Sequence, residues 1–152
     1  MLKSNGLPLS PEWGLAFLRI VVGIVFLVHG YQKLFLMGFD GVAGFFGSLG
    51  IPLPLVAAIV VTLLEFFGGL ALILGLFSRW IAIPLAIDMA VAMLTVHLAN
   101  GFSVGNGGYE FVLTLLAANV ALALAGPGTL SLDGWLQNRQ SAGSRKGFVT
   151  AN

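Results

Sequence analysis

Residues 14–36 read GLAFLRIVVGIVFLVHGYQKLFL, an apolar run in which Arg19, His29 and Lys33 are conspicuous ionisable side chains. At about 1.5 Å per residue, a helix of this length crosses a hydrocarbon layer about 30 Å thick. Three further apolar runs, residues 55–77, 79–98 and 109–125, have similar lengths. The sequence therefore predicts an all-α protein, a bundle of four transmembrane helices.

The composition supports a membrane environment. Apolar residues make up 58% of the 152-residue chain and charged residues 9%, whereas soluble chains average about 45–50% and about 25%. A soluble domain of this size could not bury that much apolar surface, so the chain needs lipid as its solvent. The net charge of +1 comes with no basic stripe, which excludes nucleic acid as a partner. The absence of cysteine excludes disulfides, iron–sulfur clusters and thiolate catalysis within this chain.

Turn-forming residues separate the four runs. They are Pro52 and Pro54, Ser78 and Arg79, the Gly/Asn/Ser stretch 101–108, and residues 126–128 (GPG). After this last break the chain becomes polar. We therefore expect a membrane domain over residues 1–130 and a polar cytoplasmic tail over residues 131–152.

The basic residues predict the orientation of the chain, because cytoplasmic loops carry an excess of Lys and Arg. With both termini in the cytoplasm, the inner side would hold Lys3, Arg19, Arg79, Arg139, Arg145 and Lys146. The outer side would hold only Lys33. This bias predicts a multi-pass membrane protein with both ends in the cytoplasm.

A glycine repeat follows the first run. Gly38, Gly41, Gly44, Gly47 and Gly50 recur at every third position, with phenylalanines between them. The stretch lacks the proline of a collagen helix. We expect a short interfacial or re-entrant helix whose small face lies against the bundle, with a plain loop as the alternative.

Ionisable side chains within the apolar runs are the candidate functional residues, because such groups are costly in a bilayer and normally face the bundle interior. His29 and Lys33 are four residues apart and share one helix face, and Arg19 falls near it. Glu65 lies near the midplane of the second run. We take His29, Lys33 and Glu65 as the candidate ligand or proton site. Arg19, Asp88 and Glu110 are candidate buried charge partners, and His97 and Asn119 are doubtful members.

Simpler interpretations stay open. A pair of Glu65 with Lys33 or Arg19 could only fix the helix register, and Glu110 at a helix start is favourable through the helix dipole alone. Asp88 and His97 are nine residues apart, on opposite faces of an ideal helix. Either the helix changes its winding before His97, or one of the two residues faces elsewhere. A haem held by the two histidines is not favoured, and no metal site is expected.

Several motifs resemble those of the DoxX family of membrane proteins. Residues 18–20 (LRI), 29–34 (HGYQKL) and 49–52 (LGIP) are similar to the family's opening. The second half is similar through residues 65–69 (EFFGG), 75–79 (GLFSR), 106–110 (NGGYE), 126–128 (GPG) and 131–133 (SLD). The resemblance covers residues 14–135.

This resemblance implies a four-helix inner-membrane protein of a family often labelled as oxidoreductases. Its relatives include a subunit of thiosulfate:quinone oxidoreductase and partners in oxidative-stress complexes. The positions carried over from the family are Arg19, His29, Lys33, Glu65, Arg79 and Glu110. Redox-active relatives in the wider superfamily use cysteines, and this chain has none.

Three functions follow as hypotheses. The first is a quinone-linked oxidoreductase component that receives electrons from a soluble or membrane partner subunit, because the chain has no redox centre of its own. The second is a non-catalytic membrane anchor or assembly subunit, and the third is a small solute or proton transporter. The partners considered are the lipid bilayer, a redox subunit and a second copy of the chain.

Overall fold

The computed structural model describes residues 11–136 and 138–139, and the regular elements of these residues are helices. Four of the helices are long: α1 (Pro11–Tyr31), α3 (Pro54–Leu74), α4 (Ser78–Ala92) and α5 (Glu110–Ala125). The predicted all-α fold is thereby confirmed. Lys3, Arg145 and Lys146, which contribute to the predicted orientation, lie outside the described residues.

Three helical stretches are long and apolar enough to cross a membrane: Pro11–Ser48, Pro54–Leu74 and Ser78–Asn100. α5 is apolar but shorter. The second run was expected to reach about residue 77, and the helix itself is slightly shorter than the run. α3 ends at Leu74 because Gly75 adopts a left-handed conformation with φ +74°. The amide of Leu76 then donates to the carbonyl of Ala71, a helix-ending arrangement that glycine favours.

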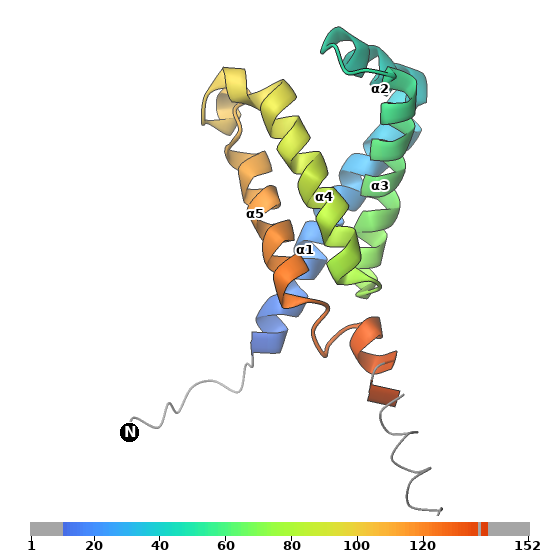
Figure 1. The fold of residues 1–152 in the computed structure, drawn as a ribbon, viewed down its shortest axis with the longest axis vertical. Helices are drawn as coiled ribbons and strands as arrows, with labels where there is room; N and C mark the ends of the chain where they lie inside the picture. The colour runs from blue at the N-terminus through green and yellow to red at the C-terminus, as the bar shows by residue number, and fades with distance from the viewer. Residues whose placement is uncertain (1–10, 137, 140–152) are drawn as a thin grey trace, which may run out of the picture.

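The long helices form two pairs that diverge from one another (Figure 1). α1 packs along α3, and α4 packs along α5. The pairs meet near the end of the molecule that carries residue 11, the 75–78 turn and residues 126–136, called the terminal end below. They spread apart toward the loop end, where the glycine-rich helix and residues 98–109 lie.

Glycines let α1 and α3 approach more closely than other residues would. A Cβ atom on Gly30 would lie 2.4 Å from the backbone nitrogen of Phe66, and one on Gly69 would lie 2.4 Å from that of Leu27. Small residues are typical of helix contacts in membranes, where packing rather than water exclusion drives association. This close contact fixes the register of α3 against α1.

The glycine-rich stretch forms the helix α2 (Gly38–Ser48), which packs against α3. A wide π-type turn, η1 (Gln32–Met37), joins it to α1, and Gly38 at φ +70° redirects the chain between the two. A helix is therefore present where the glycine repeat predicted one. Its interfacial or re-entrant position stays a prediction.

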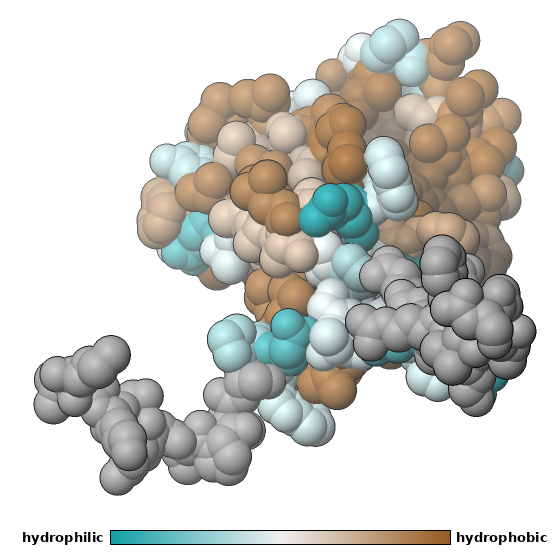
Figure 2. Space-filling view, turned by 60° about the horizontal axis from the view of Figure 1, so that its bottom comes forward, coloured by the Kyte–Doolittle hydropathy of each residue, from teal (hydrophilic) through white to brown (hydrophobic). Residues whose placement is uncertain are grey.

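Much of the outer surface is apolar, like the interior. Phe26, Leu72, Leu85 and Leu122 form part of the buried core. Large apolar side chains also cover the outside, among them Leu124 at 76% exposure, and brown apolar residues occupy most of the face in view in Figure 2. In water such a surface would aggregate, whereas in lipid it is solvated.

Residues 127–135 fold back across the terminal end instead of leaving it. The guanidinium of Arg19 donates to the carbonyl of Leu130 at 2.8 Å, and the amide of Thr129 donates to the carboxylate of Glu12 at 2.7 Å. Asp133 bonds the α3–α4 turn through its amide and its carboxylate. The first residues of the predicted polar tail thus close this end of the protein.

Candidate functional site

A cavity of about 360 Å³ lies where the two helix pairs diverge. Most of its lining is apolar and includes the aromatic rings of Phe26, Phe45, Phe46 and Phe111. Its ionisable lining residues are His29, Lys33, Glu65, Asp88 and His97. An apolar cavity with a few convergent polar groups is the usual form of a small-molecule site.

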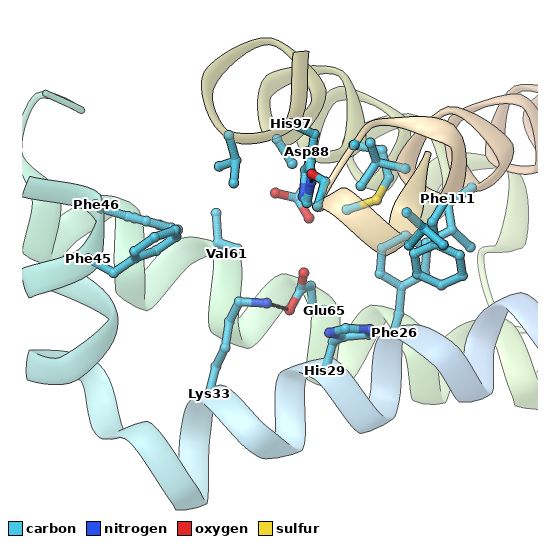
Figure 3. Close-up of a pocket in the computed structure, with 18 residues that line it drawn as sticks. Phe26, His29, Lys33, Phe45, Phe46, Val61, Glu65, Asp88, His97 and Phe111 are labelled. Carbon is cyan, nitrogen blue, oxygen red and sulfur yellow. Dashed lines mark hydrogen bonds and ion pairs between the residues drawn. The ribbon is translucent and has the colours of Figure 1, made fainter. Parts of the chain in front are cut away.

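Lys33 and Glu65 form a buried ion pair in this cavity (Figure 3). The ammonium nitrogen of Lys33 lies 2.5 Å from Oε2 of Glu65, and the Glu65 side chain is 5% exposed. The glycine contact between α1 and α3 explains how they meet. Gly30, one turn before Lys33, contacts Phe66, the residue after Glu65. Each charge needs the other, since an unpaired ion in an apolar interior is strongly destabilised.

His29 lies one helical turn before Lys33 on the same wall of the cavity. The centre of its ring is 6.4 Å from that of Phe111, with an angle of 40° between the ring planes. The imidazole from α1 thereby reaches the aromatic side of α5. A flat ring bound in the cavity would find an aromatic neighbour and a hydrogen-bonding group together.

Asp88 and His97 both line the cavity, although an ideal helix would place them on opposite faces. The helix changes its winding between them, because residues Met93–His97 form the π-type segment η2. A π turn adds a residue to each hydrogen-bonded loop and is common at functional sites. Of the two alternatives left by the sequence, the change of winding is the one that occurs.

A hydrogen bond to the 101–108 stretch holds the His97 ring in place. Its Nδ1 lies 2.7 Å from the carbonyl oxygen of Gly107. Because a carbonyl only accepts hydrogen bonds, Nδ1 carries a proton, and in the neutral ring Nε2 is left as an acceptor. Gly107 has φ +77°, a conformation that suits glycine. The glycines of the 101–108 stretch were the only signal of this contact in the sequence.

Four of the residues singled out in the sequence do not line the cavity. Arg19, expected to share an interior with His29 and Lys33, is 2% exposed and bonds Leu130 at the terminal end. Glu110 begins α5 and accepts a hydrogen bond from the amide of Val104. Asn119 is buried and donates to the carbonyl of Leu115, one turn earlier in α5. Arg79, a position carried over from the family, donates to the carbonyl of Leu124.

Phe45 and Phe46 were not among the residues proposed from the sequence. They reach the cavity from α2 and close its side near Lys33 in Figure 3. Their position depends on the turn at Gly38 and on the packing of α2 against α3. The only signal in the sequence was the presence of phenylalanines between the glycines of the repeat.

Comparisons with known proteins agree with the fold and the apolar surface. The family model DoxX matches residues 14–98. The chain is 36% identical over 142 residues to "Putative oxidoreductase CatD" of Bacillus subtilis, covering 93% of this chain and 98% of that protein. It is 33% identical over 120 residues to "Inner membrane protein YphA" of Escherichia coli, covering 76% and 84% of the two chains.

A second protein of Escherichia coli, "Inner membrane protein YqjF", is 33% identical over 132 residues, which cover 83% of this chain and 94% of that one. No solved structure matches the chain significantly. The family model spans more than half of the chain, and the relatives match it along nearly their whole length. The protein, with its apolar helices and this family match, is a membrane protein of the DoxX family.

Proposed function

We propose that this protein is a quinone-linked component of a membrane oxidoreductase and that the cavity binds the quinone head group. The observation that carries the proposal is the Lys33–Glu65 ion pair inside an apolar cavity of a lipid-facing protein. A quinone combines a flat ring, two oxygens that accept hydrogen bonds and an apolar tail. The relative from Bacillus subtilis carries the word oxidoreductase in its name.

The wall formed by α1 and α3 supplies the groups that a quinone head needs. Lys33 uses one N–H for Glu65 and has two others to donate, and His29 offers a ring nitrogen beside Phe111. Glu65 holds the ammonium group in place and can exchange protons with it. The phenylalanine side chains around these groups would contact the ring and the start of its tail.

Electrons would come from a partner subunit. The chain has no cysteine, so it can form neither a thiol–disulfide couple nor a cysteine-bound iron–sulfur cluster. The role assigned to this chain is therefore to bind the quinone, orient it and exclude bulk water. A soluble or membrane protein with its own redox centre would complete the reaction.

We also propose that all four long helices cross the bacterial inner membrane as a four-helix bundle, with both termini inside. α5, at 16 residues, is about 24 Å long and therefore shorter than a hydrocarbon core about 30 Å thick. Local thinning of the bilayer, or polar residues at the ends of the helix, would make up the difference. The terminal end then faces the cytoplasm, and the cavity lies toward the outer side. In this orientation α2 would lie near the outer surface.

The test is mass spectrometry of the organic extract from protein purified in native lipid. We expect quinone enriched over the surrounding membrane in the wild type and lost in Glu65→Gln. The matched control is Glu12→Gln, which alters a carboxylate bonded to Thr129 at the terminal end and should keep the quinone. Quinone no richer than in bulk lipid would contradict the proposal and favour a non-catalytic anchor or assembly subunit.

A further inference from the structure

A second carboxyl group faces the ion pair. Asp88 of α4 points into the cavity toward Glu65 of α3, and both carboxyl groups line the same cavity (Figure 3). Glu65 already bonds Lys33, but Oδ2 of Asp88 is fully enclosed and has no hydrogen-bond partner among the described residues. Two carboxylates cannot hydrogen-bond one another unless a proton lies between them.

The charges around Asp88 do not balance if both carboxyl groups are ionised. The ionisable groups that line the cavity are His29 of α1, Lys33 of η1, Glu65 of α3, Asp88 of α4 and His97 of η2. The lining residues from α2, α5 and residues 104–108 are apolar or glycine. One lysine therefore faces two carboxyl groups, and one negative charge would be uncompensated in an apolar interior.

The histidines are poor candidates for the missing positive charge. His29 lies one turn from Lys33, and a second cation at this spacing is repelled by the first. His97 bonds Gly107 through the Nδ1 proton, an arrangement that the neutral ring satisfies. A proton on one of the two carboxyl groups removes the imbalance with no further cation.

We propose that Glu65 and Asp88 share one proton beside Lys33, and that Asp88 is the residue that carries it. Glu65 contacts the ammonium group at 2.5 Å, which favours its anion. No Lys or Arg contacts Asp88 among the described residues, so Asp88 is the better place for the proton. The arrangement corresponds to paired acids in which two carboxyl groups too close to ionise together hold one proton.

This assignment gives the proposed function a proton donor, and this part of it rests on that function. When a partner subunit delivers two electrons to a bound quinone, the ring takes up two protons to become a quinol. The O–H bond of Asp88 breaks as one quinone oxygen gains its O–H bond, and the second proton comes from water at the mouth of the cavity. The electrons come from the partner's redox centre, and Asp88 is left as a carboxylate. Water at the mouth of the cavity would restore its proton.

The experiment is infrared spectroscopy of the full chain in nanodiscs of quinone-free lipid at neutral pH. A protonated carboxylic acid has a C=O stretching band that shifts in heavy water, and ¹³C labelling of aspartate identifies its source. We expect such a band in the wild type, shifted by the aspartate label and lost in Asp88→Asn. The matched control is Asp40→Asn, an exposed aspartate on α2, which should keep the band.

Two further variants test the charge balance itself. In Glu65→Gln, Asp88 becomes the only counter-ion of Lys33 in the cavity, so the band should disappear. In Lys33→Met no cation remains for either acid, so the band should grow. A wild-type protein without an aspartate band, or a band that survives Asp88→Asn or Glu65→Gln, would overturn the shared proton.

The sample contains no quinone, so this result is independent of the proposed function. The aspartate band without quinone enrichment in native lipid would keep the proton pair and remove the quinone site. Quinone enrichment without the band would keep the quinone site and remove the proton pair.

Discussion

Lys33 and Glu65 meet at 2.5 Å beside the close contact of α1 and α3 at Gly30 and Phe66. The packing of the two helices and the pairing of their charges therefore depend on each other. A shift of α3 by one turn would both push side chains into the glycine contact and separate the two charges.

Removing Lys33 alone should destabilise the protein more than removing both members of this pair. We expect Lys33→Met alone to lower the free energy of unfolding by about 3–5 kcal/mol, because Glu65 is left without its cation in an apolar site. Glu65→Met alone should cost less, because Asp88 can then ionise as the counter-ion of Lys33. The double variant Lys33→Met/Glu65→Met should recover most of this loss. Denaturant titration in lipid–detergent micelles measures the coupling, and additive losses would contradict a direct pair.

The glycine contact between α1 and α3 predicts that alanine destabilises the protein at Gly69 but not at Gly44. Gly69→Ala would place a methyl group 2.4 Å from the backbone of Leu27, and a backbone cannot move aside as a side chain can. We expect a loss of about 1–3 kcal/mol, the usual cost of overpacking. Gly44→Ala, where no atom lies within 4 Å, is the control and should leave the melting temperature unchanged or raised. Equal behaviour of the two variants would rule out close packing at Gly69.

His97 should be the Nδ1–H tautomer, because its Nδ1 donates to the carbonyl of Gly107. The chain has two histidines, so ¹⁵N-histidine labelling gives a simple solid-state NMR spectrum. We expect a protonated Nδ1 and an unprotonated Nε2 for one ring, and this signal should remain in His29→Gln and vanish in His97→Gln. A protonated Nε2 on His97 would mean that the ring does not bond Gly107.

Asp133 should act as a helix cap for α4 from a distant part of the chain. The amide of Ser78 donates to its carboxylate at 3.3 Å, and losing a cap of this kind costs about 0.5–2 kcal/mol. We expect Asp133→Ala to lower stability by about that amount and to speed hydrogen exchange at Ser78. Asn138→Ala, at an exposed position, is the control. Unchanged exchange at Ser78 would show that the carboxylate does not cap the helix.

The proposed orientation can be tested with single cysteines, because the chain has none of its own. A membrane-impermeant maleimide should label Ser103→Cys in intact cells and should label Asn138→Cys only after lysis. Both positions are exposed, and the segments that hold them, residues 98–109 and 138–139, lie at opposite ends of the molecule. The reverse pattern would place the terminal end outside.

Much of the fold could be predicted from the sequence because the length and polarity of a segment decide whether it partitions into lipid. Helical segments of the structure cover nearly all of the runs 14–36, 79–98 and 109–125. The end of α3 could not be placed as well. An apolar run can continue beyond a helix, and the left-handed turn at Gly75 ends the helix without a change of polarity.

The sequence alone determined that this protein lies in lipid, that it is helical and that a few charged residues are inside it, since all three depend on composition along one chain. Which charges meet was decided by the tertiary structure. On a helical wheel Arg19 is close to Lys33, yet fourteen residues separate them by about 21 Å along the axis, so Arg19 bonds Leu130 and Lys33 bonds Glu65. The winding of η2 and the return of Asp133 to α4 likewise depend on contacts between distant segments, which local sequence patterns do not encode.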